Sequence, residues 1–323
     1  MIVVSGMAGA LVGPLPWPIA TLPGFVQLEA VERDWMPGRV EAALADAGHR
    51  ADDLAWRSIG VYRAGDGAAA CRLAQRWDWC GPTLGVDAEC ASGLVAVLLA
   101  SQDLEAGHCD IAVVAAENLA TGEQGWDDGC APLAAVAREG APRAGMAVLV
   151  LERSDDAQRR RAQVAGGAHR RLGAPAGMVG LSLRGITELL RSGLVRASLS
   201  PADIGYVELH ALGSGVGDAV ELAAFRKVWE ECPGDRPTIL GSHKARFGHL
   251  EAAGGLVGLA RVVAWFDGPA VPPTAWVLPF SRLSTLPSGF TLDPCRQGAD
   301  VRAGGSLALS RSGVGAVVLM NRC

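Results

Sequence analysis

The sequence predicts a layered α/β protein, and three observations favour this fold class. Short apolar runs, such as residues 110–117, have the length and composition of strands that are buried on both faces. Segments with the residue spacing of helices alternate with these runs along the chain. Half of the 323 residues are hydrophobic and 42 are glycines, which suits closely packed helices and sheets.

The first half is expected to open with a buried strand at residues 2–5, followed by a connection rich in proline and tryptophan. Residues 39–47 predict a short helix that ends at Gly48, because glycine is common directly after a helix. The other elements expected in this half are strands at residues 56–62, 83–87, 110–117 and 144–152 and helices at residues 68–77 and 91–105.

A charged crossing at residues 153–161 divides the chain into a first half, residues 1–155, and a second half, residues 156–323. In the second half, Ser200 can cap a helix that has Pro201 at its first position. The other elements expected there are helices at residues 183–192, 220–229 and 250–266 and strands at residues 204–209, 238–241, 305–309 and 315–320.

Cys90 stands where a short strand is expected to meet a helix. The unpaired N–H groups and the positive end of the helix dipole at such a position favour thiolate over thiol, so we expect a lowered pKa and a nucleophilic sulfur. The small residues at positions 91–93 would let a substrate approach. Free cysteine is also among the most buried residue types, so the local sequence fits an inert core cysteine equally well.

Composition limits the classes of partner and compartment. A net charge of −5 gives no reason to expect nucleic acid, and no apolar stretch reaches about 18 residues without turn formers, so no membrane span is expected. The eight cysteines show no C-x-x-C pair and no zinc spacing with histidine, which favours a reduced, cytoplasmic protein without a metal site. The one dense basic patch, residues 159–161 with Arg170 and Arg171, fits a solvated face better than a carrier-protein contact.

Three segments carry a resemblance to a known family. They read VDAECASGLV at residues 86–95, YVELHALGSGVGD at residues 206–218 and GSHKARFGHLEAAGG at residues 241–255. In sequence, order and spacing they resemble the three signature blocks of the β-ketoacyl synthases, the condensing enzymes of fatty acid and polyketide synthesis within the thiolase superfamily. The resemblance implies the thiolase-like, duplicated five-layer α/β/α/β/α fold, with the nucleophile in the first half and two active-site histidines in the second.

The resemblance also implies roles for single residues. Cys90 falls on the nucleophile, His210 and His249 on the two active-site histidines, and Lys244 on the lysine five positions before the second histidine. Condensation needs a thiolate that takes an acyl group from a thioester, and donors that hold an enolate oxygen while a malonyl carboxylate leaves. Two neutral imidazoles can donate to that oxygen, and the helix dipole at His249 should disfavour its cation. Lys244 is expected to support the site and not to act as a base.

The resemblance implies no cofactor or metal, because acyl groups arrive on the phosphopantetheine of a carrier protein or on coenzyme A. The glycines at 213, 215 and 217 have the spacing G-x-G-x-G and not that of a dinucleotide site. They are expected to form the turn that brings His210 toward Cys90.

The sequence departs from the family pattern in places that bear on the substrate. Ala88 and Glu89 replace the usual Thr-Ala before the cysteine, and Glu89 is expected to point away from the sulfur or to pair with an arginine. The usual phenylalanine gate is replaced by residues 310–314, where the backbone N–H of Ser310 could serve an oxyanion hole. Arg311 could bind a carboxylate or phosphate or could face solvent, and Phe247 is expected to fill part of the space. The segments at residues 13–38 and 62–80 are shorter than in the family, so acyl chain length and mode of dimerisation stay open.

Three functions therefore remain open. The first is a condensing enzyme that makes a carbon–carbon bond by decarboxylative Claisen condensation. The second is an acyltransferase that passes the acyl group of Cys90 to an alcohol, an amine or water. The third is a non-catalytic partner of a full-length synthase, similar to a chain-length factor, although retention of Cys90, His210 and His249 argues against it. The expected partners are an acyl carrier protein and a second ketosynthase chain, in a homodimer or a heterodimer.

Overall fold

The computed structural model describes residues 1–12, 22–28, 35–119, 144–173, 181–211, 215–267, 286, 288–291 and 302–323. Gly213 and parts of the connection at residues 13–38 lie outside the described residues. Within the described ranges no helix is both long and apolar enough to cross a bilayer.

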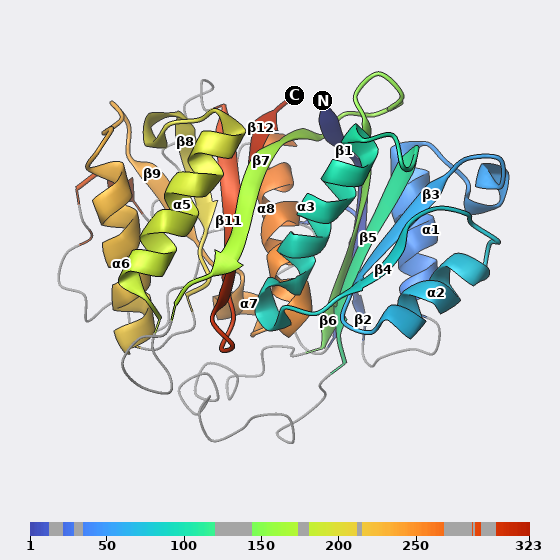
Figure 1. Ribbon diagram of the computed structural model, residues 1–323, viewed down its shortest axis with the longest axis horizontal. Helices are drawn as coiled ribbons and strands as arrows, with labels where there is room; N and C mark the ends of the chain where they lie inside the picture. The colour runs from blue at the N-terminus through green and yellow to red at the C-terminus, as the bar shows by residue number, and fades with distance from the viewer. Residues whose placement is uncertain are drawn as a thin grey trace.

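The strands form one mixed 12-stranded sheet in the order β10-β9-β8-β11-β12-β7-β1-β6-β5-β3-β4, with β2 pairing with β1 beside this path (Figure 1). The strand bounds are β1 Ile2–Val12, β2 Phe25–Leu28, β3 Ile59–Ala64, β4 Thr83–Val86, β5 Ile111–Asn118, β6 Gly145–Arg153, β7 Ala162–Arg171, β8 Ile204–Glu208, β9 Thr238–Gly241, β10 Phe290–Thr291, β11 Ala303–Leu309 and β12 Val314–Arg322.

The sheet consists of two copies of one pattern. In the first half β1 and β6 are antiparallel, β6 and β5 are antiparallel, and β5, β3 and β4 are parallel neighbours. In the second half β7, β12, β11, β8 and β9 repeat the same order and the same directions. Among the described strands, the two copies are hydrogen-bonded to each other where the first residues of β1 pair with the first residues of β7.

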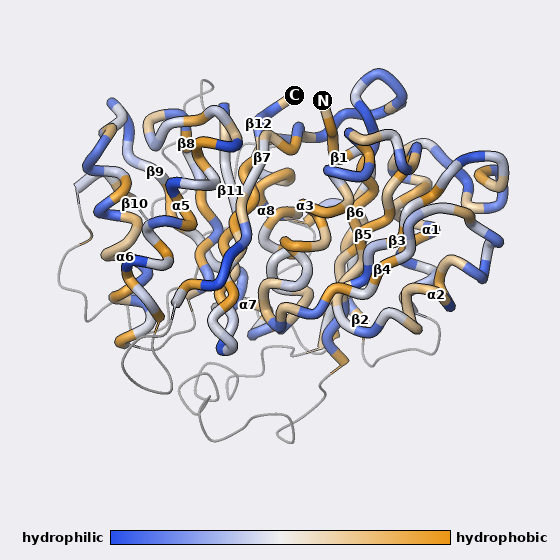
Figure 2. Tube along the Cα trace, viewed as in Figure 1, coloured by the Kyte–Doolittle hydropathy of each residue, from blue (hydrophilic) through white to orange (hydrophobic). Residues whose placement is uncertain are grey.

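The helices form three layers around the two strand sets. Helices α1 (Trp35–Ala47) and α2 (Gly67–Gln75) cover the outer face of the first set, whereas α5 (Leu183–Ala197) and α6 (Gly215–Trp229) cover the outer face of the second (Figure 1). Helices α3 (Ser92–Glu105) and α8 (Gly254–Asp267) lie between the sets and share the central hydrophobic core with both. Figure 2 shows that the strands and central helices are predominantly hydrophobic. This arrangement confirms the predicted five-layer, thiolase-like fold.

Close packing of α3 against α8 brings the two halves of the site together. A Cβ on Gly255 would lie 2.6 Å from Cγ of Leu94, and a Cβ on Gly93 would lie 2.8 Å from the backbone oxygen of Ala252. Neither distance leaves room for a side chain, so these glycines set the separation of the helices. Cys90 lies just before α3 and His249 just before α8, so this packing places them next to each other.

Most predicted elements are present. The helix start predicted at Ser200 and Pro201 is confirmed as the single 3-10 turn Pro201–Asp203, which has a capping box between Ser200 and Asp203 and leads directly into β8. The predicted helix at residues 250–266 is divided into the 3-10 turn Glu251–Ala253 and α8, with Glu251 at a φ of 45°. The short helix α7 (Lys244–Phe247) lies ahead of both.

Candidate active site

Cys90 lies in a 3-10 turn, Glu89–Ala91, between β4 and α3. The hydroxyl of Ser92 accepts from the N–H of Ala88 at 2.8 Å and donates to the carbonyl of Glu89 at 2.7 Å. These two bonds fix the turn, and Cys90 is only 6% exposed. The sulfur therefore faces the interior between the two halves at the start of the central helix.

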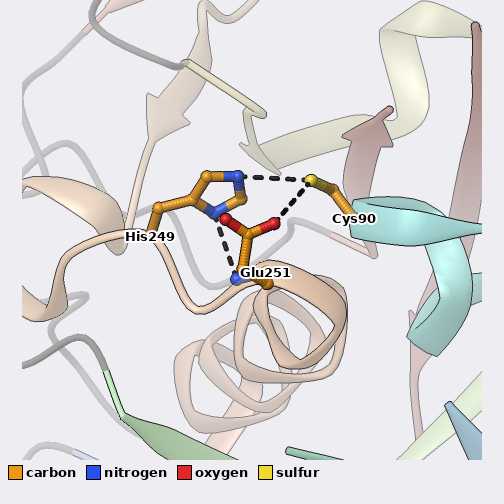
Figure 3. Close-up of side chains that lie close together, drawn as sticks. All are labelled: Cys90, His249 and Glu251. Carbon is orange, nitrogen blue, oxygen red and sulfur yellow. Dashed lines mark hydrogen bonds between the residues drawn. The ribbon is translucent and has the colours of Figure 1, made fainter. Parts of the chain in front are cut away.

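His249 meets Cys90 from the second half of the chain. Its Nε2 lies 3.3 Å from Sγ, while the backbone N–H of Glu251 donates to its Nδ1 at 3.2 Å (Figure 3). Because Nδ1 accepts a hydrogen bond, the ring proton of the neutral imidazole lies on Nε2. His249 therefore donates its N–H toward the sulfur.

Glu251 supplies the second contact to the sulfur. The thiol of Cys90 donates to Oε2 of Glu251 at 3.4 Å (Figure 3). The left-handed backbone of Glu251, which non-glycine residues rarely adopt, lets one residue bind His249 through its N–H and Cys90 through its carboxylate. This contact between the side chain of Glu251 and Cys90 was not predicted from the sequence.

The expected low pKa of Cys90 is wrong for this structure. Burial raises the pKa of the thiol, the negative charge of Glu251 raises it further, and the positive charge of Lys244 opposes both without reversing them. Desolvation of a thiolate and a neighbouring carboxylate both favour the protonated form. At neutral pH the sulfur is therefore a thiol.

His210 follows β8 and places its ring next to that of His249. The two ring centroids are 5.7 Å apart and the rings meet edge to face, at 81°. The backbone N–H groups of His210 and Ala211 donate to the carboxylate of Glu221 at 2.7 and 2.8 Å. Nζ of Lys244 donates to the carbonyl of His210. The structure thus brings together all four predicted catalytic residues, Cys90, His210, His249 and Lys244.

Both histidines are neutral at physiological pH, as the sequence predicted. Burial lowers the pKa of His210 and of His249 well below the usual value, and the charge of Lys244 lowers both further. Burial is the largest cause for both histidines, whereas the sequence had named only the helix dipole at His249. Lys244 is itself buried, which lowers its pKa, whereas Glu221 opposes this shift.

Two buried glutamates behind the histidines were not identified from the sequence. Burial and the neighbouring Asp218 raise the pKa of Glu221 to about 7. Burial alone would raise the pKa of Glu208, but Arg261 and His243 lower it to about 2. One carboxylate oxygen of Glu208 accepts a hydrogen bond from Nε of Arg261 at 3.0 Å, and the other lies 3.0 Å from Nδ1 of His243. An arginine in the middle of the apolar segment 254–267 was the signal that a buried acid must lie nearby.

The predicted substrate-binding residues lie around the site with different exposure. Phe247 is buried in the central core. Ser310 is also buried, and its N–H donates to the carbonyl of Val314 at 2.8 Å, so this N–H belongs to the β11–β12 turn and not to an oxyanion hole. Arg311 is exposed at the tip of the turn, and its charge lowers the pKa of His249.

Glu89 connects the cysteine turn to the same β11–β12 turn. Its Oε2 accepts from the N–H of Ser312 at 3.0 Å. The carboxylate still contributes to the raised pKa of Cys90, as a smaller cause than burial and Glu251. Glu89 therefore fixes the turn that carries Arg311.

The donor atoms of Cys90, His249 and Glu251 lie within 4.8 Å of one another, so this group is the one among the described residues that could hold a metal ion. Sulfur, nitrogen and oxygen donors at this separation suit zinc. A metal on Nε2 of His249 would need the ring proton to move to Nδ1, where the N–H of Glu251 already points. The hydrogen bonds therefore favour the metal-free arrangement.

Comparisons with known proteins agree with this geometry. The model of the β-ketoacyl synthase N-terminal domain matches residues 57–157, and that of the C-terminal domain matches residues 161–277. One of the proteins that make up the phenolphthiocerol/phthiocerol polyketide synthase of Mycobacterium tuberculosis is 36% identical over 220 residues, which cover 63% of this chain and 10% of that protein. The chain thus spans about a tenth of the length of such relatives.

Solved ketosynthase structures show the same fold. Ketosynthase twelve from the bacillaene polyketide synthase of Bacillus amyloliquefaciens superposes with a TM-score of 0.80 at 18% identity, covering 100% of this chain and 75% of that chain. The ketosynthase from module 6 of the bacillaene synthase of Bacillus subtilis 168 superposes with a TM-score of 0.75 at 22% identity, covering 89% of this chain and 57% of that chain. This chain therefore covers only part of each of these two solved chains.

Proposed function

Because this chain belongs to the β-ketoacyl synthase family, as a shortened member, we propose that it is a ketosynthase-like acyl-thioester enzyme of polyketide or fatty acid biosynthesis. The observation that carries the proposal is the contact between Sγ of Cys90 and Nε2 of His249, with the ring of His210 beside it. An inert core cysteine has no need of a neutral imidazole that donates to its sulfur, with a second imidazole beside the first.

In the proposed reaction, the sulfur of Cys90 attacks an acyl thioester on carrier phosphopantetheine or coenzyme A, and the carrier thiol leaves. A malonyl thioester then loses carbon dioxide, and its enolate oxygen lies between the imidazoles of His210 and His249. The enolate carbon attacks the acyl carbonyl on Cys90, which restores the sulfur and gives a β-ketoacyl carrier. Donors held in place by burial and by Glu251 need little reorganisation during this step.

The proposed partners are an acyl carrier protein and a second ketosynthase chain, and the proposed compartment is the cytoplasm. Strand β4 lies at the end of the sheet order and exposes Leu84 at 41%. An open edge strand of this kind suits pairing with the same strand of another copy. A homodimer along β4 would place the two Cys90 turns near the shared edge, because each turn directly follows β4.

A second candidate function is acyl transfer without elongation. The β11–β12 turn carries Ser310, Arg311 and Ser312, and no aromatic side chain that could delay a second substrate. A turn without such a side chain could admit an alcohol, an amine or water to the acyl group on Cys90.

Intact-mass measurement tests both candidates. The protein is incubated with a panel of acyl carrier and acyl cysteamine thioesters, and malonyl carrier protein is then added. We expect an adduct on Cys90 that disappears as a β-ketoacyl carrier forms, and no adduct on the Cys90→Ala variant. An adduct that persists until an amine or alcohol is supplied would establish the transferase, and no adduct with any donor would favour a non-catalytic partner of a full-length synthase.

A further inference from the structure

Acyl loading begins with the loss of the thiol proton of Cys90, and the structure restricts where that proton can go. Cys90 is buried, and its raised pKa keeps the sulfur protonated at neutral pH. A thiol is a weak nucleophile, so loading needs a base at the sulfur itself.

Among the described residues, two groups are hydrogen-bonded to the sulfur, and one of these two is an acceptor. Nε2 of His249 carries the ring proton because Nδ1 accepts from the N–H of Glu251, so His249 cannot take a second proton without becoming a cation. Burial and Lys244 both oppose that cation. Oε2 of Glu251, at 3.4 Å, is the group to which the thiol donates.

We infer that Glu251 is the general base that takes the thiol proton of Cys90 during acyl loading. As the Sγ–carbon bond forms, the proton moves from Sγ to Oε2, and His249 donates its N–H toward the reacting centre. When the tetrahedral intermediate collapses, the bond between the acyl carbon and the carrier sulfur breaks, and Oε2 returns the proton to that sulfur. No oxidant, reductant or further reactant is needed.

The backbone of Glu251 supports this role. A non-glycine residue at a φ of 45° is uncommon, and such conformations persist where the surrounding structure requires them. Here the conformation places the carboxylate at the sulfur while the N–H of the same residue fixes the tautomer of His249 (Figure 3). The side chain of Glu251 is thus the base, and its backbone N–H keeps His249 in the tautomer that donates from Nε2.

This inference rests on the proposed function, because it concerns the loading step of that reaction. Its test is the single-turnover rate of acyl loading, measured by quenching and intact mass across the neutral pH range. Glu251→Gln keeps the size of the side chain and the backbone N–H but removes the base. We expect loading to slow by about a hundredfold or more, the usual contribution of general base catalysis.

The pH profile of the loading rate distinguishes a general base from a carboxylate that only changes the charge near Cys90. With Cys90 protonated and Glu251 as its base, the loading rate of the unmodified protein should be flat across neutral pH. In Glu251→Gln the rate should follow the thiolate fraction and rise about tenfold for each pH unit. Glu89→Gln is the matched control, since it removes another carboxylate that raises the pKa of Cys90 but whose own hydrogen bond goes to Ser312. The Glu89→Gln profile should stay flat.

Alkylation by iodoacetamide provides a readout that does not depend on acyl substrates. Removing Glu251 should lower the pKa of Cys90, so alkylation at fixed pH becomes faster while acyl loading becomes slower. Loading in Glu251→Gln that is equal to or faster than in the unmodified protein, or that keeps a flat profile, would overturn the role of Glu251. Absence of loading in the unmodified protein would instead overturn the proposed function, and the inference with it.

Discussion

The two sides of the site hold their histidines in different ways. On the His249 side the imidazole itself is fixed, with Nε2 directed at Cys90 and Nδ1 bound by the N–H of Glu251. On the His210 side the peptide is fixed, with two N–H groups bound to Glu221 and the carbonyl bound to Lys244. The first side thus determines a tautomer and a contact with the nucleophile, whereas the second determines only where the ring lies.

In the proposed reaction, this difference would give the two sides different steps. A fixed donor at the sulfur can act both in acyl loading and in decarboxylation. A ring that is positioned edge to face against His249 can act on the second substrate. The charges that hold the second side, Glu221 and Lys244, are buried behind the reacting atoms and are positioning residues.

The largest expected effect comes from removing each imidazole in turn. His210→Ala and His249→Ala should each slow malonyl decarboxylation by about 10²–10³-fold, the usual loss for one oxyanion donor. Acyl loading should be slowed more by His249→Ala than by His210→Ala, because His249 is the histidine that contacts Sγ. Single-turnover loading and carbon dioxide release measure the two steps separately. Equal loss of loading in both variants would contradict the division between the sides.

The next effect concerns Glu221, which holds the His210 side. Its pKa is raised from 4.5 to about 7, so the folded protein keeps a proton that the unfolded chain releases. The free energy of unfolding is therefore greatest below pH 4.5, the pKa in the unfolded chain, and falls by about 3 kcal/mol as the pH rises through the pKa of the folded protein. Glu221→Gln should remove this decline. Urea unfolding at several pH values measures it, and an unchanged pH dependence would show that Glu221 does not titrate as described.

Glu208 provides the contrast that makes the Glu221 result specific. It is equally buried, but Arg261 lowers its pKa to about 2. Its contribution to stability is present above the unfolded pKa of 4.5 and is lost only as pH falls toward 2. Protonation of Glu221 therefore changes the stability above pH 4.5, and protonation of Glu208 changes it below pH 4.5. Unfolding measurements near neutral pH thus test Glu221.

The smallest expected effect is a change in stability, and it concerns the backbone conformation of the residue next to each histidine. Ala211 follows His210 at a φ of 35°, whereas Gly248 precedes His249 at a φ of 73°. A side chain in this region costs about 1–2 kcal/mol. Ala211→Gly should therefore stabilise the fold by about 1 kcal/mol, and Gly248→Ala should destabilise it by at least as much. Thermal unfolding of the two variants measures this, and a shift in the same direction for both would contradict the assigned strain.

The residues that meet at the site were predictable from three sequence blocks, although Cys90 and His249 are 159 positions apart. Their electrostatics were not predictable, because burial and neighbours decide the direction of each pKa. Local signals at Cys90 favoured a thiolate, yet burial and Glu251 hold it as a thiol. By contrast, the local signal at Ser200 and Pro201 was confirmed, since a capped 3-10 turn begins there and leads into β8.

The most direct test of the account is the fate of a malonyl thioester given to the acylated protein. The protein is loaded with an acyl group on Cys90, freed of donor, and mixed with malonyl carrier protein whose leaving carboxylate is isotopically labelled. The account predicts that labelled carbon dioxide and β-ketoacyl carrier form in equal amounts as the Cys90 adduct disappears. An adduct that stays on Cys90 while no labelled carbon dioxide is released would contradict the proposed condensation.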